Sequence, residues 1–394
     1  MNQGRTIFAQ LMDCFLSQYA FYQIVDKHRG DHRVRTLSCL DQFRAMAFAQ
    51  LTGRESLRDI QNCLTAFQDK LYHAGFRGPI SRSTLADANE RRPWEMWAEV
   101  TLALIAIARP LYASEDFGVE LEQTAYALDS STVDLCLTLF PWAHFRKTKA
   151  GVKLHTLLDL RGNIPAFLVI TDASMHDVNL MDEICNEAGS VYIVDRGYLD
   201  FARLWRIKER QAFFVTRAKS NTKARRQSSR EVDRATGLVC DQSVVLTRAS
   251  SRHDYPEPLR RIAYIDKETG HRYVFLTNHF GLEALSVAKL YKCRWGVELF
   301  FKWIKQHLRV KAFFGRSENA VKTQIWIGIG VYVLVAIVKK RLHLAPSPYT
   351  ILQVLGLTLF EKMPIKQALS GVIDDEFDSI SNTMGPKQLE LFDF

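Results

Sequence analysis

The sequence lacks the features by which cysteine-rich, fibrous and disordered proteins are identified. Its seven cysteines are odd in number and scattered, and none has the CxxC spacing of a zinc or redox site. Hydrophobic residues make up 47% of the chain and charged residues 24%, which excludes a collagenous, coiled-coil or disordered protein. We expect the cysteines to be reduced thiols, most of them packed as small apolar core residues.

The sequence also lacks a secretory or membrane-spanning segment. Its first ten residues contain no charged stretch followed by an apolar one, so we expect no signal peptide. The one membrane-like run, 325–338, has 14 residues. That length is too short to cross about 30 Å of hydrocarbon and is typical of a buried helix. These absences predict a cytoplasmic protein with no membrane partner.

Positive charge is what the chain has in excess. Lysine and arginine number 52 against 43 aspartates and glutamates, which gives a formal net charge of +9. This excess favours a polyanionic partner, with nucleic acid as the first candidate. At 394 residues the chain is long enough for two or three domains with ample cores.

The chain divides into a helical front part and an α/β part. Residues 1–115 carry helical patterns, and the segments 55–60 and 81–85 resemble pieces of a helix-turn-helix, so both DNA contact and a plain helical bundle stay open. Beyond residue 118 we expect strands at 124–128, 152–160, 164–170, 191–194 and 212–216, and helices at 177–187 and 201–211. This order predicts a mixed sheet with helices on its faces.

A β insertion is expected at 217–280, where further strands are predicted at 239–246, 262–266 and 273–277. Ten basic residues against two acids lie between Arg203 and Glu231. Such a run is either a solvated loop or a phosphate-binding surface, and we favour phosphate contact. The residues chosen as DNA contacts are Arg217, Lys219, Arg225 and Arg226.

A helix expected at 282–308 carries one polar stripe on an otherwise apolar surface. Its members recur at offsets 0, 3, 7, 11 and 14: Tyr291, Arg294, Glu298, Lys302 and Lys305. At about 100° per residue they lie within roughly 80° of one another. Because the rest of the helix is apolar, the stripe must face a partner or a site. An ordinary i,i+4 ion pair would explain only Glu298 and Lys302.

Two aspartates follow apolar strands. Asp129 comes at the end of the strand at 124–128, and Asp195 at the end of the strand at 191–194. A single aspartate of this kind is commonly a turn or cap residue. Two of them together with Glu298 would repel one another unless divalent cations lay between them. Magnesium or manganese suits such oxygen ligands, and two ions about 4 Å apart can assist phosphodiester hydrolysis.

Other acids compete with these three for a catalytic place. Asp134 is the main alternative to Asp129, since it lies only five residues further on. The remaining acids of this region are expected to be caps, turn residues or solvated charges: Asp159, Asp172, Asp177 and Asp200.

The polar stripe has the spacing of a known signature. Tyr, two residues, Arg, three residues, Glu, six residues and Lys fit 291 to 305 without a gap, and this resembles bacterial insertion-sequence transposases of the DDE class, in the branch named for insertion sequence 4. The likeness extends to Asp129 within Ala-Leu-Asp-Ser-Ser-Thr, to Asp195 within Val-Asp-Arg-Gly-Tyr and to the segment 140–160. It covers most of the chain.

The resemblance implies a ribonuclease-H-like α/β core at 116–345, with helices on both faces of a mixed sheet and the β insertion at 217–280. An all-α domain at 1–115 precedes it and a C-terminal region with an acidic tail, 346–394, follows. Two magnesium ions, replaceable by manganese, are implied on Asp129, Asp195 and Glu298. Contacts to DNA phosphates are implied for Tyr291, Arg294 and Lys305. We expect Lys302, on the same stripe, to share this role.

The implied activity is cut-and-paste DNA recombination, through a hairpin intermediate that is part of the resemblance alone. The implied partners are the element's terminal inverted repeats, target DNA and a second copy of the chain in a synaptic complex, and the implied location is the bacterial cytoplasm near the nucleoid. Two other functions stay open. One is a nuclease or resolvase of the same fold that only hydrolyses DNA, and the other is a domesticated DNA-binding protein without catalysis.

The acidic tail ends in an apolar motif that the catalytic prediction does not need. From Gln388 to Phe392 the sequence is Gln-Leu-Glu-Leu-Phe. This motif can dock on the protein's own core or support a dimer contact. It also resembles the short peptide by which bacterial proteins bind the replication sliding clamp, where leucine and phenylalanine fill an apolar pocket.

Overall fold

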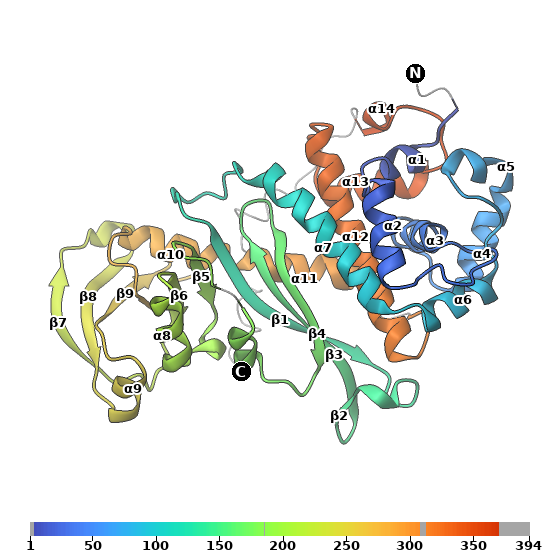
Figure 1. Ribbon diagram of the computed structural model, residues 1–394. Helices are drawn as coiled ribbons and strands as arrows, with labels where there is room; N and C mark the ends of the chain where they lie inside the picture. The colour runs from blue at the N-terminus through green and yellow to red at the C-terminus, as the bar shows by residue number, and fades with distance from the viewer. Residues whose placement is uncertain (1–3, 185, 308–312, 370–394) are drawn as a thin grey trace. The chain divides into compact units, whose positions relative to one another are not determined.

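The computed structural model describes residues 4–184, 186–307 and 313–369 (Figure 1). Two compact units are present, of which the first comprises Met1–Tyr112, Asp134–Ala150 and Lys302–Phe394. The second comprises Ala113–Val133 and Gly151–Phe301. The tail motif at 388–392 lies outside the described residues.

Helices build nearly all of the first unit, as the front part of the sequence predicts. Serine or threonine hydroxyls accept backbone N–H bonds at the start of several of these helices, at Thr6, Ser17, Ser38 and Ser56. The front helices are α1 (Ile7–Met12), α2 (Gln18–Lys27), α3 (Cys39–Thr52), α4 (Leu57–Ala66), α5 (Gln68–Leu71), the 3-10 helix η1 (Tyr72–Ala74), α6 (Arg82–Arg91) and α7 (Trp94–Tyr112). The later elements are the 3-10 helix η2 (Pro141–Ala143), the short strand β2 (His144–Arg146), α12 (Glu318–Arg341), α13 (Pro348–Thr358) and α14 (Ile365–Leu369).

Helix α12 forms the centre of the first unit. Its apolar window has a mean hydropathy of 1.9 and is 94% buried. The Thr101 hydroxyl of α7 donates to the Trp326 carbonyl at 2.9 Å, and the Tyr112 hydroxyl donates to the Ala336 carbonyl at 2.9 Å. By length and composition α12 alone among the described helices resembles a membrane span, but its burial marks it as a core helix. The prediction of a buried helix at 325–338 is therefore confirmed.

The second unit is organised by a mixed sheet. Its strands are β1 (Ala125–Leu135), β3 (Lys149–Asp159), β4 (Ile164–Asp172), β5 (Val191–Val194), β6 (Phe213–Arg217), β7 (Ala224–Arg230), β8 (Leu238–Leu246), β9 (Leu259–Ile265) and β10 (Arg272–Thr277). The order of these strands in the sheet is β3-β1-β5-β6-β10-β9-β8-β7, with β4 paired to β3. Strand β5 is parallel to both β1 and β6, and all four of its residues are buried, as a central strand of continuous apolar sequence should be.

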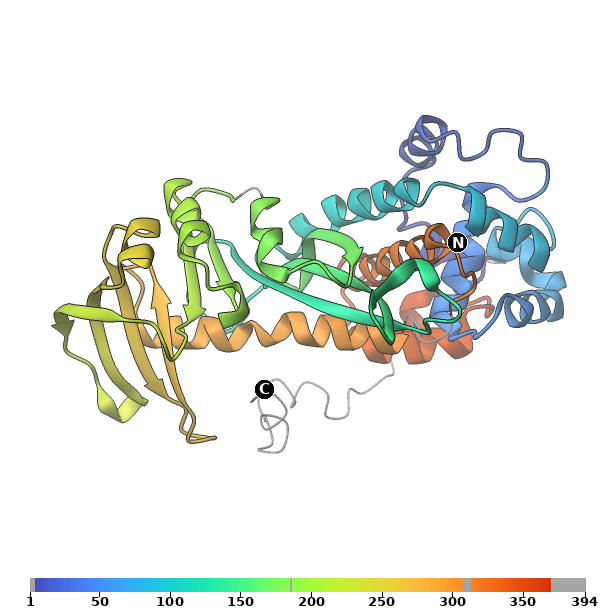
Figure 2. The same cartoon turned by 90° about the horizontal axis from the view of Figure 1, so that it is seen from below.

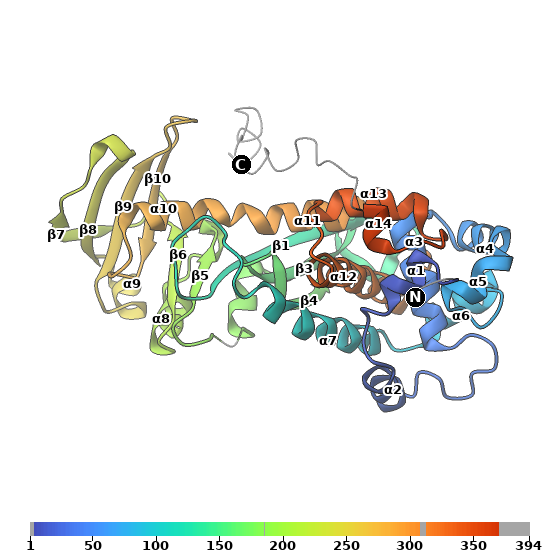
Figure 3. The same cartoon turned by 90° about the horizontal axis from the view of Figure 1, so that it is seen from above.

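Helices lie on both faces of this sheet. Near β5 and β6, α8 (Phe201–Glu209) lies on one face and α10 (Ala284–Cys293) on the other (Figures 2 and 3). The side chains between the sheet and α8 form an apolar cluster that includes Tyr126, Tyr192, Leu204 and Phe214. The short helix α9 (Ala249–Asp254) and the 3-10 helices η3 (Asp177–Asp182), η4 (Arg196–Tyr198) and η5 (Arg234–Thr236) complete the unit's helices up to α10. The predicted α/β class and the β insertion are confirmed.

Several elements differ from the prediction. The helix expected at 177–187 is the short 3-10 helix η3, and the strand expected to stop at residue 128 continues to Leu135. The long helix expected at 282–308 is described as α10 and then α11 (Trp295–His307). At the turn between them the Arg294 N–H donates to the Tyr291 carbonyl at 3.2 Å, a bond three residues back rather than four. The sequence predicts no strand at β7, because six of its seven residues are polar and all seven are exposed at the sheet edge.

The cysteines are less buried than expected. All six that the structure describes are free thiols, but Cys39 alone among them is buried and Cys136 is exposed. The prediction that most are apolar core residues is therefore wrong. Cys63 shows the reason, since its thiol donates to Asp59 at 3.3 Å in a half-exposed polar setting.

Candidate active site

Strand register places three predicted residues side by side. Leu128 of β1 lies opposite Val194 of β5, and Val194 lies opposite Thr216 of β6. The next residue on each strand is Asp129, Asp195 and Arg217 respectively. Because these strands are parallel, the three side chains come at the same carboxyl end of the sheet, where α/β proteins commonly bind ligands.

The helix pair α10 and α11 supplies the partners of these aspartates. Arg294 donates from Nη1 to Asp129 Oδ2 at 2.8 Å and from Nη2 to Glu298 Oε1 at 2.5 Å. Tyr291 donates from its hydroxyl to Asp195 Oδ1 at 2.8 Å. Two carboxylates from the sheet therefore meet a tyrosine, an arginine and a glutamate from the helices, although 96 or more residues separate the two groups in the chain.

This cluster is largely shielded from water. The Arg294 side chain is 15% exposed, and the side chains of Asp129 and Glu298 are each 21% exposed. The Tyr291 ring packs against the Phe275 ring of β10 with centroids 5.0 Å apart. Charges in such surroundings interact more strongly than on an open surface, so the cluster has to balance its own charge.

Burial and pairing move the pKa values of the three carboxyls in different directions. Burial raises the pKa of Asp129 to about 6, against the lowering effect of Arg294. Burial likewise raises the pKa of Glu298 against Arg294. For Asp195, burial alone would raise the pKa, but Arg294 and the Tyr291 hydroxyl together lower it below its ordinary value. Of the three carboxyls, Asp195 is therefore the one whose ionised form is most strongly stabilised.

Beside Asp129 lies a polar network that the sequence did not indicate. The Ser130 N–H donates to Asp129 Oδ1 at 2.8 Å, and the Ser130 hydroxyl donates to Asp177 Oδ1 at 2.6 Å. Lys153 pairs with the same Asp177 oxygen at 3.0 Å. Asp177, expected to be a cap or a solvated charge, is thus tied to Ser130 and Lys153. Position 153 lies within the segment 140–160 that resembles insertion-sequence transposases, and this was the one available signal.

The other competing acids lie in settings that suit structural roles. Asp200 is the N-cap of α8 and accepts from the Arg203 N–H at 3.0 Å. Asp159 accepts from the Arg161 N–H at 3.0 Å. Asp134 is exposed near the end of β1, five residues beyond Asp129, and Asp172 is exposed at the end of β4.

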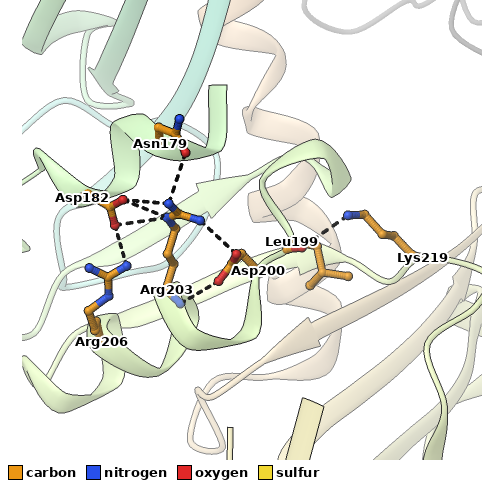
Figure 4. A network of polar contacts seen from close by, with 7 residues as sticks. All are labelled: Asn179, Asp182, Leu199, Asp200, Arg203, Arg206 and Lys219. Carbon is orange, nitrogen blue, oxygen red and sulfur yellow. Dashed lines mark hydrogen bonds and ion pairs between the residues drawn. The ribbon is translucent and has the colours of Figure 1, made fainter. Parts of the chain in front are cut away.

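The predicted DNA contacts fall into separate groups. Arg217 lies next to Asp195, and its guanidinium lies over the Tyr273 ring at 5.0 Å. Lys302 and Lys305 are exposed further along α11. Arg225 and Arg226 are exposed on the edge strand β7, while Lys219 donates to the Leu199 carbonyl at 3.3 Å (Figure 4). A hollow lined by Asn221, Lys223, Thr247 and Arg248 continues the basic surface of β7.

Part of the basic run is neutralised within the fold. Arg203 donates to both oxygens of Asp182, at 2.7 Å from Nη2, and pairs with Asp200 at 2.9 Å (Figure 4). Arg206 also bonds to Asp182, at 2.5 Å. These two arginines link α8 to η3 through ion pairs with Asp182. The prediction of phosphate contact therefore applies to the exposed basic residues that follow them in the sequence.

The donor chemistry of the cluster suits a hard divalent cation, but its present arrangement favours a guanidinium. Asp129, Asp195 and Glu298 supply carboxylate oxygens, the ligands that magnesium and manganese prefer. In the part of the chain that the structure describes, no three acidic, histidine or cysteine side chains are grouped so as to hold a metal ion. Arg294 takes one oxygen each from Asp129 and Glu298 instead. A metal ion bound between Asp129 and Glu298 would therefore lie against the positive charge of Arg294.

Known proteins similar to this chain are transposases. The Transposase DDE domain family matches residues 120–334, and a domain of unknown function matches residues 3–77. "Putative transposase y4zB" of Sinorhizobium fredii is 35% identical over 64% of this chain and 70% of its own length. "Putative transposase for insertion sequence element IS4SA" of Synechocystis is 25% identical over 77% of this chain and 82% of its own length.

Among solved structures, the piggyBac transposase synaptic complex with hairpin DNA has a TM-score of 0.44 at 10% identity, over 93% of this chain and 85% of that chain. The sequence and family matches confirm the resemblance drawn from the spacing of Tyr291, Arg294, Glu298 and Lys305.

Proposed function

The chain belongs to the Transposase DDE domain family and acts as a DNA transposase, and we propose that it moves an insertion sequence by cut-and-paste transposition. Members of this family cleave and transfer DNA and generally use divalent metals. The observation that supports the finer proposal is the bonded cluster in which Tyr291 and Arg294 hold Asp195, Asp129 and Glu298. The reaction we propose is phosphodiester hydrolysis followed by strand transfer.

Asp129, Asp195 and Glu298 are the proposed holders of two magnesium ions, with manganese as a substitute. When bound, such ions supply positive charge to the attacking and leaving oxygens of a phosphodiester. The chain's own residues prepare this site. Tyr291 fixes one oxygen of Asp195, and the Ser130 N–H fixes one oxygen of Asp129. The second oxygen of Asp195 is not part of the Tyr291 bond, whereas the second oxygen of Asp129 accepts from Arg294.

The basic residues are proposed to grip the phosphates of double-stranded DNA, at the terminal inverted repeats and at the target. Lysine and arginine bind phosphates without reading sequence, so they position the DNA rather than select it. The residues proposed for this role are Tyr291, Arg294, Lys302, Lys305, Arg217, Lys219, Arg225 and Arg226. Lys219 uses one of its three N–H donors on the Leu199 carbonyl, which leaves the others for a phosphate.

The remaining parts of the chain are assigned by the same proposal. Residues 1–115 would bind DNA through helices such as α6, 116–345 would be the catalytic core, and 346–394 would be a C-terminal region. A homodimer would form the synaptic complex in the bacterial cytoplasm. The tail from Gln388 to Phe392 would bind the replication sliding clamp and bring the protein to replicating DNA.

A cleavage and joining assay tests the proposal. Oligonucleotides carrying the element's ends, taken from the DNA that flanks the gene, should be cut in magnesium. Asp129→Ala, Asp195→Ala or Glu298→Ala should each abolish cleavage while end binding persists, because each removes a carboxylate and leaves the basic residues intact. Asp134→Ala is the matched control and should cleave normally. Loss of cleavage in this control, with activity kept in Asp129→Ala, would reverse the assignment.

The same assay separates the transposase from the nuclease. Pre-cut ends mixed with a target plasmid should give joined products. Cleavage without joining would favour a nuclease of the same fold, and binding without either would favour a domesticated DNA-binding protein.

A further inference from the structure

Arg294 binds its neighbours in an unusual way for a shielded arginine. It gives one N–H to Asp129 on the sheet and one to Glu298 on α11, two carboxylates from different elements. Its Nε is buried and has no hydrogen-bond partner among the described residues. The guanidinium therefore bridges two carboxylates as a single positive charge would, and does not use its full set of donors.

Arg260 in the β insertion shows what a structural arginine looks like in the same protein. It bonds one carboxylate through two donors, Nε to Asp241 Oδ1 at 2.9 Å and Nη2 to Asp241 Oδ2 at 2.7 Å. Its Nη1 donates to the His279 carbonyl at 3.0 Å and also to the Leu282 carbonyl. Every nitrogen of Arg260 is thus engaged, whereas Arg294 keeps one buried nitrogen without a partner.

Asp129 and Glu298 are two of the three carboxylates that would hold a metal ion. The guanidinium of Arg294 lies between them, and a divalent cation placed there would meet its positive charge, so the two cations compete for this position. Removing Arg294 without a replacement would leave Asp129, Asp195 and Glu298 as a shielded group of like charges, which is costly. Movement of the Arg294 guanidinium away from these carboxylates is therefore favourable only if another cation takes its place.

The position and chemistry of Arg294 bear on whether its guanidinium can bind another anion. It occupies the turn between α10 and α11, where the backbone tightens to a bond three residues back. A guanidinium binds a phosphate in the same forked geometry in which it binds a carboxylate. A DNA phosphate beside the cluster therefore offers Arg294 an exchange of one anion for another.

We propose that Arg294 holds the cation position between Asp129 and Glu298 in the DNA-free protein and yields it to divalent metal when its guanidinium passes to a DNA phosphate. This inference rests on the proposed transposase site. It makes metal binding and DNA binding mutually favourable, because each ligand removes an obstacle to the other, and such coupling is reciprocal. The protein then takes up catalytic metal mainly on DNA.

Measuring Mn²⁺ binding to the full chain tests whether metal uptake depends on DNA. Electron paramagnetic resonance gives the concentration of free Mn²⁺. The DNA is a pre-cut element end with a dideoxy 3′ terminus, so that no strand transfer occurs. In wild type, this DNA should tighten Mn²⁺ binding by roughly tenfold, within the usual range of coupling between sites. Arg294→Gln should bind Mn²⁺ about tenfold more tightly than wild type without DNA. DNA should then add little further tightening.

Arg196→Gln is the matched control. Arg196 is exposed and directly follows Asp195, so its replacement removes one positive charge near the site without touching Asp129 or Glu298. Its Mn²⁺ affinity should stay within about twofold of wild type, because an exposed charge is well screened. An equal gain in both variants would show that lost charge alone explains the effect and would overturn the inference.

Two further results decide the matter. Equal Mn²⁺ affinity of wild type and Arg294→Gln without DNA would overturn the inference. If thermal melting shows that Arg294→Gln does not fold, Arg294→Lys replaces it, since one ammonium cannot bridge two carboxylates as a fork does. Arg294→Lys should then show an intermediate gain, and no gain would overturn the inference. Failure of wild type to cut DNA would instead overturn the proposed function, because the DNA-free measurement does not depend on cleavage.

Discussion

Replacing Asp129 by asparagine tests whether burial or the Arg294 ion pair dominates at this carboxyl. Burial raises its pKa from the ordinary 3.8 to about 6, although Arg294 lies 2.8 Å away. At about 1.36 kcal/mol per pKa unit, this difference corresponds to roughly 3 kcal/mol. Asparagine keeps the shape of the side chain and removes the charge, so the variant isolates that energy.

The direction with pH follows from proton binding. Because the folded pKa is the higher one, the native state binds the proton more tightly than the unfolded state. The contribution of Asp129 to stability is therefore fully present below about pH 4 and is lost as the pH rises through about 6. The unfolding free energy of wild type, relative to that of Asp129→Asn, should therefore fall by about 2 kcal/mol between pH 4.5 and pH 7.5.

Hydrogen exchange of the β5 amides measures this energy in the full chain, since strand β5 is buried at the centre of the second unit. The ratio of protection factors between wild type and Asp129→Asn should decrease about 30-fold over this pH range. Asp172→Asn, at the exposed end of β4, is the control and should leave the ratio flat. A ratio that stays constant or rises with pH would mean that the ion pair outweighs burial, and the reasoning would be refuted.

Three other outcomes are expected. Lys305→Ala should reduce the salt dependence of end binding by roughly one phosphate contact, and an unchanged slope would assign this exposed lysine to the fold alone. Arg225→Ala with Arg226→Ala should lower the same slope by about two, whereas Arg203→Ala, whose side chain is paired inside the fold, should lower the melting temperature and leave the slope unchanged. A peptide of residues 384–394 should bind purified sliding clamp with micromolar affinity, about −8 kcal/mol, and alanines at its last leucine and phenylalanine should abolish the binding in calorimetry.

Sequence alone was sufficient for the elements whose pattern is strong. The strand at 191–194 is a short apolar run that must be buried on both faces, and it is β5 with the same bounds. The run at 325–338 is too apolar for a surface and too short for a membrane, and it lies in the buried helix α12. The spacing of Tyr291, Arg294 and Glu298 indicated the family, and the family matches confirm it.

Hydrophobic and charge patterns did not predict the structure of exposed segments. Strand β7 has no apolar alternation, because it is an exposed edge strand whose strand partner is β8. The basic run looked uniform in sequence, yet Arg203 and Arg206 are bound to Asp182 while Arg225 is exposed. An arginine that is paired in the fold and one that is not look the same in the sequence. Only the tertiary structure shows which of them has an acidic neighbour.

The sequence by itself determined which side chains carry charge, which runs must be buried and at what spacing the helical residues recur, since these properties are local. It could not determine how Asp129 and Asp195 meet the helix, because that depends on parallel pairing between distant strands. Only the tertiary structure placed Arg294 between Asp129 and Glu298, and only there does burial raise the pKa of one carboxyl while pairing lowers that of another. Solvent exclusion and the distance between charges are properties of the folded chain, and they set the chemistry of this cluster.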